Sequence, residues 1–168
     1  MAYLTIGDKE YKSRCDFAFD RLANEKYSTA DEKGKGGTMN IYMSLLNEEA
    51  SYLSAFWDCA LAYLKKEKPS TEAIEEAIIK IIDEDETGDA IDKMINEAFT
   101  TLDSAGFFKG VIRQRWKMME KMNKGKKPAP NETPEMEAKR LEDEENGKEV
   151  LKMMKEAYKE RTGSTMTK

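Results

Sequence analysis

An acidic segment near the middle of the chain carries the residues whose spacing comes nearest to a metal site. Positions 1, 3, 5 and 6 of a calcium-binding EF-hand loop are matched by Asp83, Asp85, Thr87 and Gly88. That loop needs a bidentate Glu at position 12, where this chain has Met94. Because the closing ligand is missing, we expect a solvated turn that ends a helix, with calcium binding as the alternative.

A glycine-rich segment, Gly34-Lys35-Gly36-Gly37-Thr38, contains the residue types that cradle phosphate in P-loops. A P-loop, however, has four residues between its first glycine and a Gly-Lys-Ser/Thr ending, and it connects a strand to a helix. Neither condition is met here. The sequence therefore predicts a mobile loop over residues 28–38 rather than a phosphate site.

Residues for nucleophilic or metal-assisted catalysis are scarce. The chain has no histidine, which excludes Ser-His-Asp and Cys-His pairs and histidine-bound zinc or iron. Its two cysteines, Cys15 and Cys59, are far apart and lie in apolar-periodic segments, so we expect both to be buried and reduced. Asp20 and Asp58 lie nearest to apolar stripes, but no pocket that would shift a catalytic pKa is indicated. We therefore expect a protein that is not an enzyme and has no cofactor and no bound metal.

Composition limits the classes of partner. The chain has 168 residues, of which 36 % are charged and 39 % hydrophobic, and a net charge of −5. An acidic chain without a basic stripe is a poor candidate for neutralising nucleic-acid phosphates. No apolar run reaches the roughly 18 residues of a membrane span, and the N-terminus does not resemble a signal peptide. We expect a cytoplasmic protein that binds neither nucleic acid nor membrane.

The spacing of apolar residues predicts a mainly α-helical fold with a short N-terminal β-hairpin. Strand-type residues over 3–6, a turn over 7–9 and a return over 10–14 indicate the hairpin. Helical spacing then predicts helices from Asp16 to about residue 27, over 39–46 and 50–64, from Ser70 to residue 82, and over 91–102 and 107–122. Asp16 and Ser70 are the expected N-caps of their helices. The apolar residues of the first helix include Phe17 and Phe19, and the helix that begins at Ser70 has a predicted buried stripe of Ile74, Ala77, Ile78, Ile81 and Ile82.

The last quarter of the chain differs in composition. Residues 124–134 hold three of the four prolines and almost nothing apolar, which predicts a partly stiff linker. Residues 135–161 favour a single charged helix, although Gly147 weakens it, and the chain end is expected to be disordered. We predict a helical core over 1–123, a linker over 124–134, and a charged C-terminal helix with a disordered end over 135–168.

The order of these elements resembles the tail assembly chaperones of long-tailed, siphovirus-type bacteriophages and prophages of Gram-positive hosts. The resemblance covers roughly residues 3–125. It is carried by the Leu-Thr-Ile-Gly-Asp-Lys-Glu-Tyr hairpin over 4–11, the Ser-Thr-Glu-Ala-Ile-Glu-Glu-Ala helix start over 70–77, and the Gly-Phe-Phe-Lys ending over 106–109.

The resemblance implies a role in assembly. Proteins of this family keep the long tape measure protein soluble, help to recruit subunits of the major tail tube protein around it, and are absent from the finished particle. The implied partners are thus the tape measure protein and the major tail tube protein, with self-association as a further expectation. The implied location is the host cytoplasm. No cofactor and no catalytic residue are carried across.

Partner-binding residues are predicted on the helix over 107–122, because its apolar residues are dense enough for a groove on a helix otherwise rich in Lys and Arg. The predicted contacts are Phe107, Phe108, Val111, Ile112 and Met119. Packing of this helix into the core is the alternative, and it is favoured because a small helical domain needs every apolar stripe it has. For the whole chain, the alternative is an acidic helical interaction or regulatory protein. A DNA-binding regulator using the local basic strip of Arg113, Arg115, Lys117 and Lys121 is favoured less.

Overall fold

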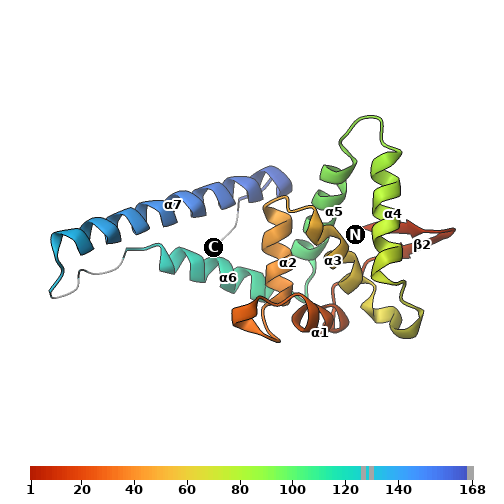
Figure 1. Ribbon diagram of the computed structural model, residues 1–168, viewed down its shortest axis with the longest axis horizontal. Coiled ribbons are helices and arrows are strands. Elements are labelled where there is room, and N and C mark those ends of the chain that lie inside the picture. The colour runs from red at the N-terminus through yellow and green to blue at the C-terminus, as the bar shows by residue number, and fades with distance from the viewer. Residues whose placement is uncertain (126–127, 129–130, 166–168) are drawn as a thin grey trace. The chain divides into compact units, whose positions relative to one another are not determined.

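Helices form most of the chain and follow an N-terminal β-hairpin (Figure 1). This computed structural model describes residues 1–125, 128 and 131–165, and it confirms the predicted fold class. Contacts divide the chain into two compact units, Met1–Lys109 and Gly110–Lys168. The functional division into 1–123, 124–134 and 135–168 stays a prediction; its linker residues 126, 127, 129 and 130 and the chain end over 166–168 lie outside the described residues.

The hairpin consists of β1 (Tyr3–Ile6) and β2 (Lys9–Lys12), paired antiparallel with Leu4 opposite Tyr11. Gly7 turns the chain at a φ of 62°, in the left-handed region that glycine adopts without strain. At the open end, the Ser13 hydroxyl accepts a hydrogen bond from the backbone N–H of Ala2 and donates one to its carbonyl. A two-stranded hairpin is marginal alone, and this one is held because Leu4 is buried in the core and β1 packs beside α4.

Five α-helices and two 3₁₀ turns complete the described part of the first unit. They are α1 (Phe17–Lys26), η1 (Ala30–Glu32), α2 (Gly37–Leu46), α3 (Ser51–Ala60), η2 (Ala62–Glu67), α4 (Thr71–Asp83) and α5 (Ala90–Ser104). Both predicted N-caps are confirmed. The Asp16 carboxylate accepts the backbone N–H groups of Ala18 and Phe19, and the Ser70 hydroxyl accepts that of Ala73. Large side chains from four of these helices fill the core, among them Phe19, Tyr42, Phe56 and Phe99.

The start of α2 differs from the prediction, because the helix begins at Gly37 within the glycine-rich segment. A Cβ atom at Gly37 would lie 1.9 Å from the carbonyl oxygen of Ala23 in α1. The Gly37 N–H also donates to the side-chain oxygen of Asn24, 2.9 Å away. Glycine at this position thus permits the backbones of α1 and α2 to approach closely.

The helix predicted over 50–64 is also shorter than expected. The α-helix ends at Ala60, and the chain turns through η2, where Lys65 has a φ of 55°. Two contacts account for the turn: the Tyr63 hydroxyl donates to the carbonyl of Lys12, and the Lys68 ammonium returns to Asp58. A continuous helix would carry both side chains away from these partners.

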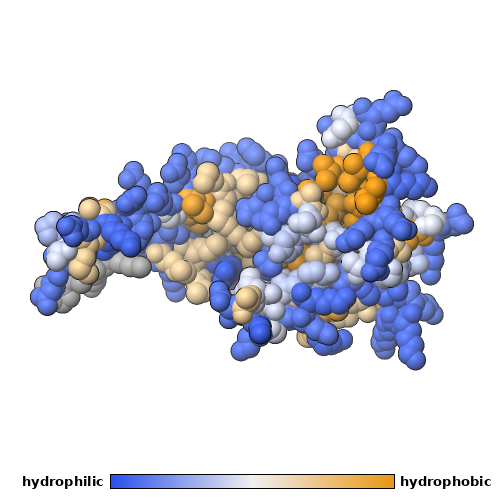
Figure 2. All heavy atoms as spheres, in the orientation of Figure 1, coloured by the Kyte–Doolittle hydropathy of each residue, from blue (hydrophilic) through white to orange (hydrophobic). Residues whose placement is uncertain are grey.

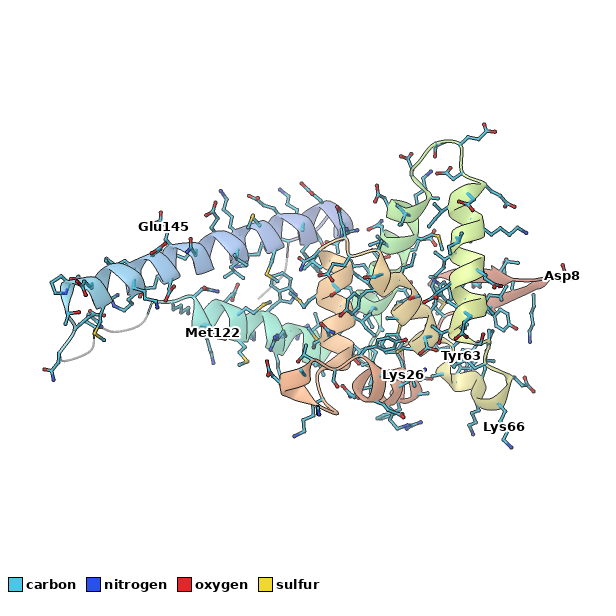
Figure 3. All side chains as sticks on the ribbon, in the orientation of Figure 1. Asp8, Lys26, Tyr63, Lys66, Met122 and Glu145 are labelled. Atoms are coloured by element: carbon cyan, nitrogen blue, oxygen red, sulfur yellow. The ribbon has the colours of Figure 1, made fainter. Side chains whose placement is uncertain are left out.

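Asp58 is a fully buried carboxylate that joins several elements of the first unit. The Tyr27 hydroxyl and the Lys26 ammonium donate to Oδ2 over 3.0 and 3.2 Å. Lys68 and the Thr71 hydroxyl donate to Oδ1. Lys26 lies in the last turn of α1 and Tyr63 in the η2 turn (Figure 3). The donors thus come from the end of α1, the segment after η2 and the start of α4.

These donors decide the ionisation of Asp58. Burial by itself raises the pKa of a carboxylate, but the hydrogen bond and charge of Lys68, with the bonds from Tyr27 and Lys26, outweigh it and lower the pKa of Asp58 below its ordinary value. Burial and the adjacent Asp58 charge raise the pKa of Tyr27, which therefore stays a neutral donor.

The second unit contains α6 (Lys109–Met122), which begins at the unit boundary, and α7 (Pro134–Thr162). Trp116 and Tyr158 are buried and meet edge to face with ring centroids 5.8 Å apart. Lys155 pairs with Glu120 at 2.7 Å. The single C-terminal helix is confirmed, and Gly147 has a packing reason: a Cβ there would lie 2.2 Å from the side-chain oxygen of Asn123.

Replacing Gly37 by alanine should destabilise the first unit. Because the new Cβ would collide with backbone rather than with a movable side chain, we expect Gly37→Ala to lower the free energy of unfolding by about 3 kcal/mol. Chemical denaturation would measure the change. Gly106→Ala, where nothing lies within 4 Å of the added atom, should leave stability nearly unchanged. Equal stability of the two variants would show that α1 and α2 can separate without cost.

Replacing Asp58 by asparagine should lower the free energy of unfolding by about 3 kcal/mol, because Lys68 would be left without its buried anion. The lowered pKa of Asp58 fixes the sign of the pH dependence. Its stabilisation is present above the unfolded-state pKa of about 3.9 and is lost as the pH falls through the lower folded-state pKa. Denaturation curves recorded between neutral and acid pH should therefore converge for the two proteins in acid. Glu97→Gln, at an exposed carboxylate, is the control; a constant gap at every pH would contradict the assigned charge state.

Candidate functional site

The acidic segment after α4 is a turn, as predicted, and its hydrogen bonds are local. One oxygen of Asp85 accepts the N–H and hydroxyl of Thr87, and the other accepts the backbone N–H of Ala90 at 2.8 Å. The bonds from Thr87 and Ala90 lower the pKa of Asp85. The carboxylate thus stabilises the start of α5. Over 1–125, 128 and 131–165, no three His, Cys, Asp or Glu side chains lie where they could share an ion.

The two cysteines and the carboxylates of Asp20 and Asp58 are either enclosed by the protein or hydrogen-bonded. Cys59 is buried as predicted, whereas Cys15 is only half-buried because it lies where the hairpin leads into α1. Burial, assisted by Asp16, raises the pKa of Cys15 to about 12, and burial raises that of Cys59 as well. Asp58 is closed off by its four donors, and Asp20 accepts the Thr38 hydroxyl at 2.7 Å. These contacts favour a structural role over a catalytic one for the four side chains.

The predicted partner residues fall in both units and differ in exposure. Phe107 is 40 % exposed and Val111 is 50 % exposed, while Met119 is half-buried. Phe108 and Ile112 are buried. Phe107 and Phe108 belong to the first unit, and the other three belong to the second. Phe107 and Val111 thus have side chains that solvent can reach, whereas those of Phe108 and Ile112 are enclosed.

Phe17 is an exposed aromatic residue whose position the sequence did not predict. Its helical spacing placed it among the apolar residues of its helix, yet it is 69 % exposed and its ring meets that of Phe107 edge to face, with centroids 4.4 Å apart. Phe107 in turn contacts Phe108, and Phe108 contacts the buried Phe19. We call Phe17 and Phe107 the aromatic pair. A row of rings connects this pair to the core, so it is held in place on the surface.

A second apolar surface follows one side of α6. Val111, Met118 and Met122 are exposed and spaced by seven and four residues, which places them on one helix face with Arg115 between them. We call these four residues the α6 outer face; Met122 lies at the end of the helix (Figure 3). The buried residues Ile112 and Trp116 lie on another side of α6, because the helix repeats every 3.6 residues.

Isoleucines that were expected in a buried stripe reach the surface on α4. Ile74 and Ile78 are buried as predicted, but Ile81 and Ile82 are only half-buried. Ile79, which the stripe did not include, is 54 % exposed. Strongly hydrophobic residues gather over α4 and α5 in Figure 2. The sequence signal for this surface was Ile79, an isoleucine that lies outside the apolar stripe of its helix.

None of the described helices is both long enough and apolar enough to cross a membrane. No curated protein and no solved structure matches the chain significantly. Residues 3–116, however, match the family model described as phage tail assembly chaperone protein, TAC. The match spans the hairpin, all helices of the first unit and the first half of α6, and includes every apolar surface named above except the end of α6. The chain therefore belongs to the phage tail assembly chaperone family.

Proposed function

We propose that this tail assembly chaperone binds the tape measure protein, keeps it soluble, and helps to recruit subunits of the major tail tube protein around it. It acts in the host cytoplasm and is absent from the mature particle. The observation that carries the proposal is the family match over residues 3–116, because that range includes a surface suited to binding apolar segments. The siphovirus type of the phage and its Gram-positive host belong to the same proposal.

A chaperone of this kind has to present apolar groups to its client and remain dissolved itself. The aromatic pair and the α6 outer face present large apolar side chains. Charged residues make up 36 % of the chain, a fraction that favours solubility despite these exposed apolar groups. Methionine adapts to irregular partners because its side chain is unbranched and polarisable, which suits Met118 and Met122 to a client with many different segments.

Five residues carry the proposal at residue level: Phe107, Phe108, Val111, Ile112 and Met119. Phe107 and Val111 offer exposed side chains to an apolar helix face of the tape measure protein. Phe108 supports Phe107, since their ring centroids are 4.7 Å apart. Ile112 and Met119 contribute through the packing of α6.

Co-expression with the tape measure protein tests the proposal. We expect the tape measure protein to become soluble and to co-purify only when this chain is present. Phe107→Asp and Val111→Asp should each reduce the co-purified amount at least fivefold, because a carboxylate cannot be buried against an apolar helix without a partner. Far-UV circular dichroism should show unchanged helicity, since both side chains are exposed.

Met153→Asp provides a control at a methionine of similar exposure on α7, outside the family match. It should retain the tape measure protein in full. If the tape measure protein stays insoluble with the unaltered chain, the proposed function is wrong. If the unaltered chain retains the tape measure protein and both variants retain it equally well, the function stands and the assignment of Phe107 and Val111 is wrong. A gel-shift titration with DNA, run in parallel, tests the alternative of a DNA-binding regulator, which the basic residues of α6 suggest.

A further inference from the structure

The isoleucine surface of α4 and α5 has no role in the proposal above. We define the α4–α5 patch as Ile79 and Ile82 of α4 with Ile91 and Met94 of α5; the residues of each pair lie three positions apart, on one side of their helix. Ile79 is exposed and the other three are half-buried. The buried residues Ile78 and Ile95 lie in the same two helices. The patch is thus the outer edge of a packed core, and a partner that covers it would extend that core.

Acidic side chains border this patch. The segment over 80–93, which joins the ends of α4 and α5, contains Asp83, Glu84, Asp85, Glu86, Asp89 and Asp92 against two lysines, Lys80 and Lys93. Lys80 pairs with Glu84 and Lys93 with Asp89, both at 3.8 Å and both exposed. Asp85 is engaged with the start of α5. Glu86 and Asp92 are exposed at the same end of the helix pair, so the rim keeps a net negative charge.

A helix is the partner shape that such a surface fits. Two helices that are packed together offer rows of side chains between which a third helix can lie, and an amphipathic helix inserts residues of its apolar face. The acidic rim decides which residues can flank the apolar face of that helix. It attracts lysine and arginine and repels aspartate and glutamate. We propose that the α4–α5 patch binds an amphipathic α-helix with basic flanks, supplied by the tape measure protein. The choice of the tape measure protein as source rests on the proposed function.

Two model peptides of about 20 residues, roughly five helical turns, test the surface. Both carry the same leucine face, one with lysine and arginine flanks and the other with glutamate flanks. Fluorescence anisotropy with the full chain should show binding of the basic peptide and at least tenfold weaker binding of the acidic one. Rising salt should weaken the binding of the basic peptide, because exposed rim charges are screened.

Two variants place the binding on the patch. Ile79→Asp should weaken binding of the basic peptide at least tenfold, and its exposed position should spare the fold. Glu84→Lys combined with Glu86→Lys should reverse the preference between the peptides. Met153→Asp again serves as the control and should bind like wild type. If Ile79→Asp binds the basic peptide normally, or if both peptides bind equally well to the unaltered chain, the proposal is wrong.

Co-purification with the tape measure protein separates this inference from the proposed function. If the unaltered chain retains the tape measure protein and Ile79→Asp loses it, the inference is supported. Retention by both proteins leaves the function standing and overturns the patch as its site. Failure of the unaltered chain overturns the function and with it the source of the helix. If Ile79→Asp instead lowers the mass of the chain alone in light scattering, the occupant is a second copy and the proposal is wrong.

Discussion

The buried charge of Asp58 is the constraint on which the arrangement of the first unit depends. A carboxylate without access to water stays ionised only if donors surround it, and here they come from residues 10 to 32 positions away in the sequence. Satisfying them fixes the end of α1, the turn after α3 and the start of α4 at once. Because α4 is oriented from that end, the direction in which its isoleucines emerge follows from the same network. The interaction therefore connects a buried polar requirement with an apolar surface at the other end of the helix.

The surfaces that we assign to binding share one property: each is attached to a rigid interior. Phe107 is exposed, but through Phe108 it continues into the ring of Phe19 in the core. Ile79 and Ile82 belong to a helix that also buries Ile74 and Ile78 in the core. An apolar side chain held in place loses less conformational freedom on binding than one on a mobile loop. Fixed contact points of this kind suit the proposed client, whose many segments would each have to bind to the same side chains.

The sequence predicted the elements well because their signals are local. Asp16 and Ser70 predicted the starts of two helices, and strand-type residues around a Gly-Asp turn predicted the hairpin. The failures involve contacts between distant residues. The end of α3 depends on Tyr63 reaching Lys12 and Lys68 reaching Asp58, and the start of α2 depends on Gly37 lying against Ala23. The sequence also could not predict that Phe17 and Ile79 are exposed, because an apolar residue on a helix is buried only if a neighbouring element covers it. The resemblance to phage tail assembly chaperones, stated from element order, was confirmed by the match over 3–116; the siphovirus type, the Gram-positive host and the partner residues stay predictions.

An exposed isoleucine surface presents any chaperone with the risk of binding to its own copies. The acidic rim around the α4–α5 patch addresses this physically. Two copies that approach through these patches bring Glu86 and Asp92 toward their counterparts, and like charges that lose water repel strongly. The net charge of −5 adds a weaker, longer-ranged repulsion between copies. The rim thus acts on association twice: it opposes contact between patches, and it favours a client helix whose flanks are basic. Selectivity for the client and resistance to aggregation then arise from the same few carboxylates, which explains why so acidic a turn adjoins so apolar a surface.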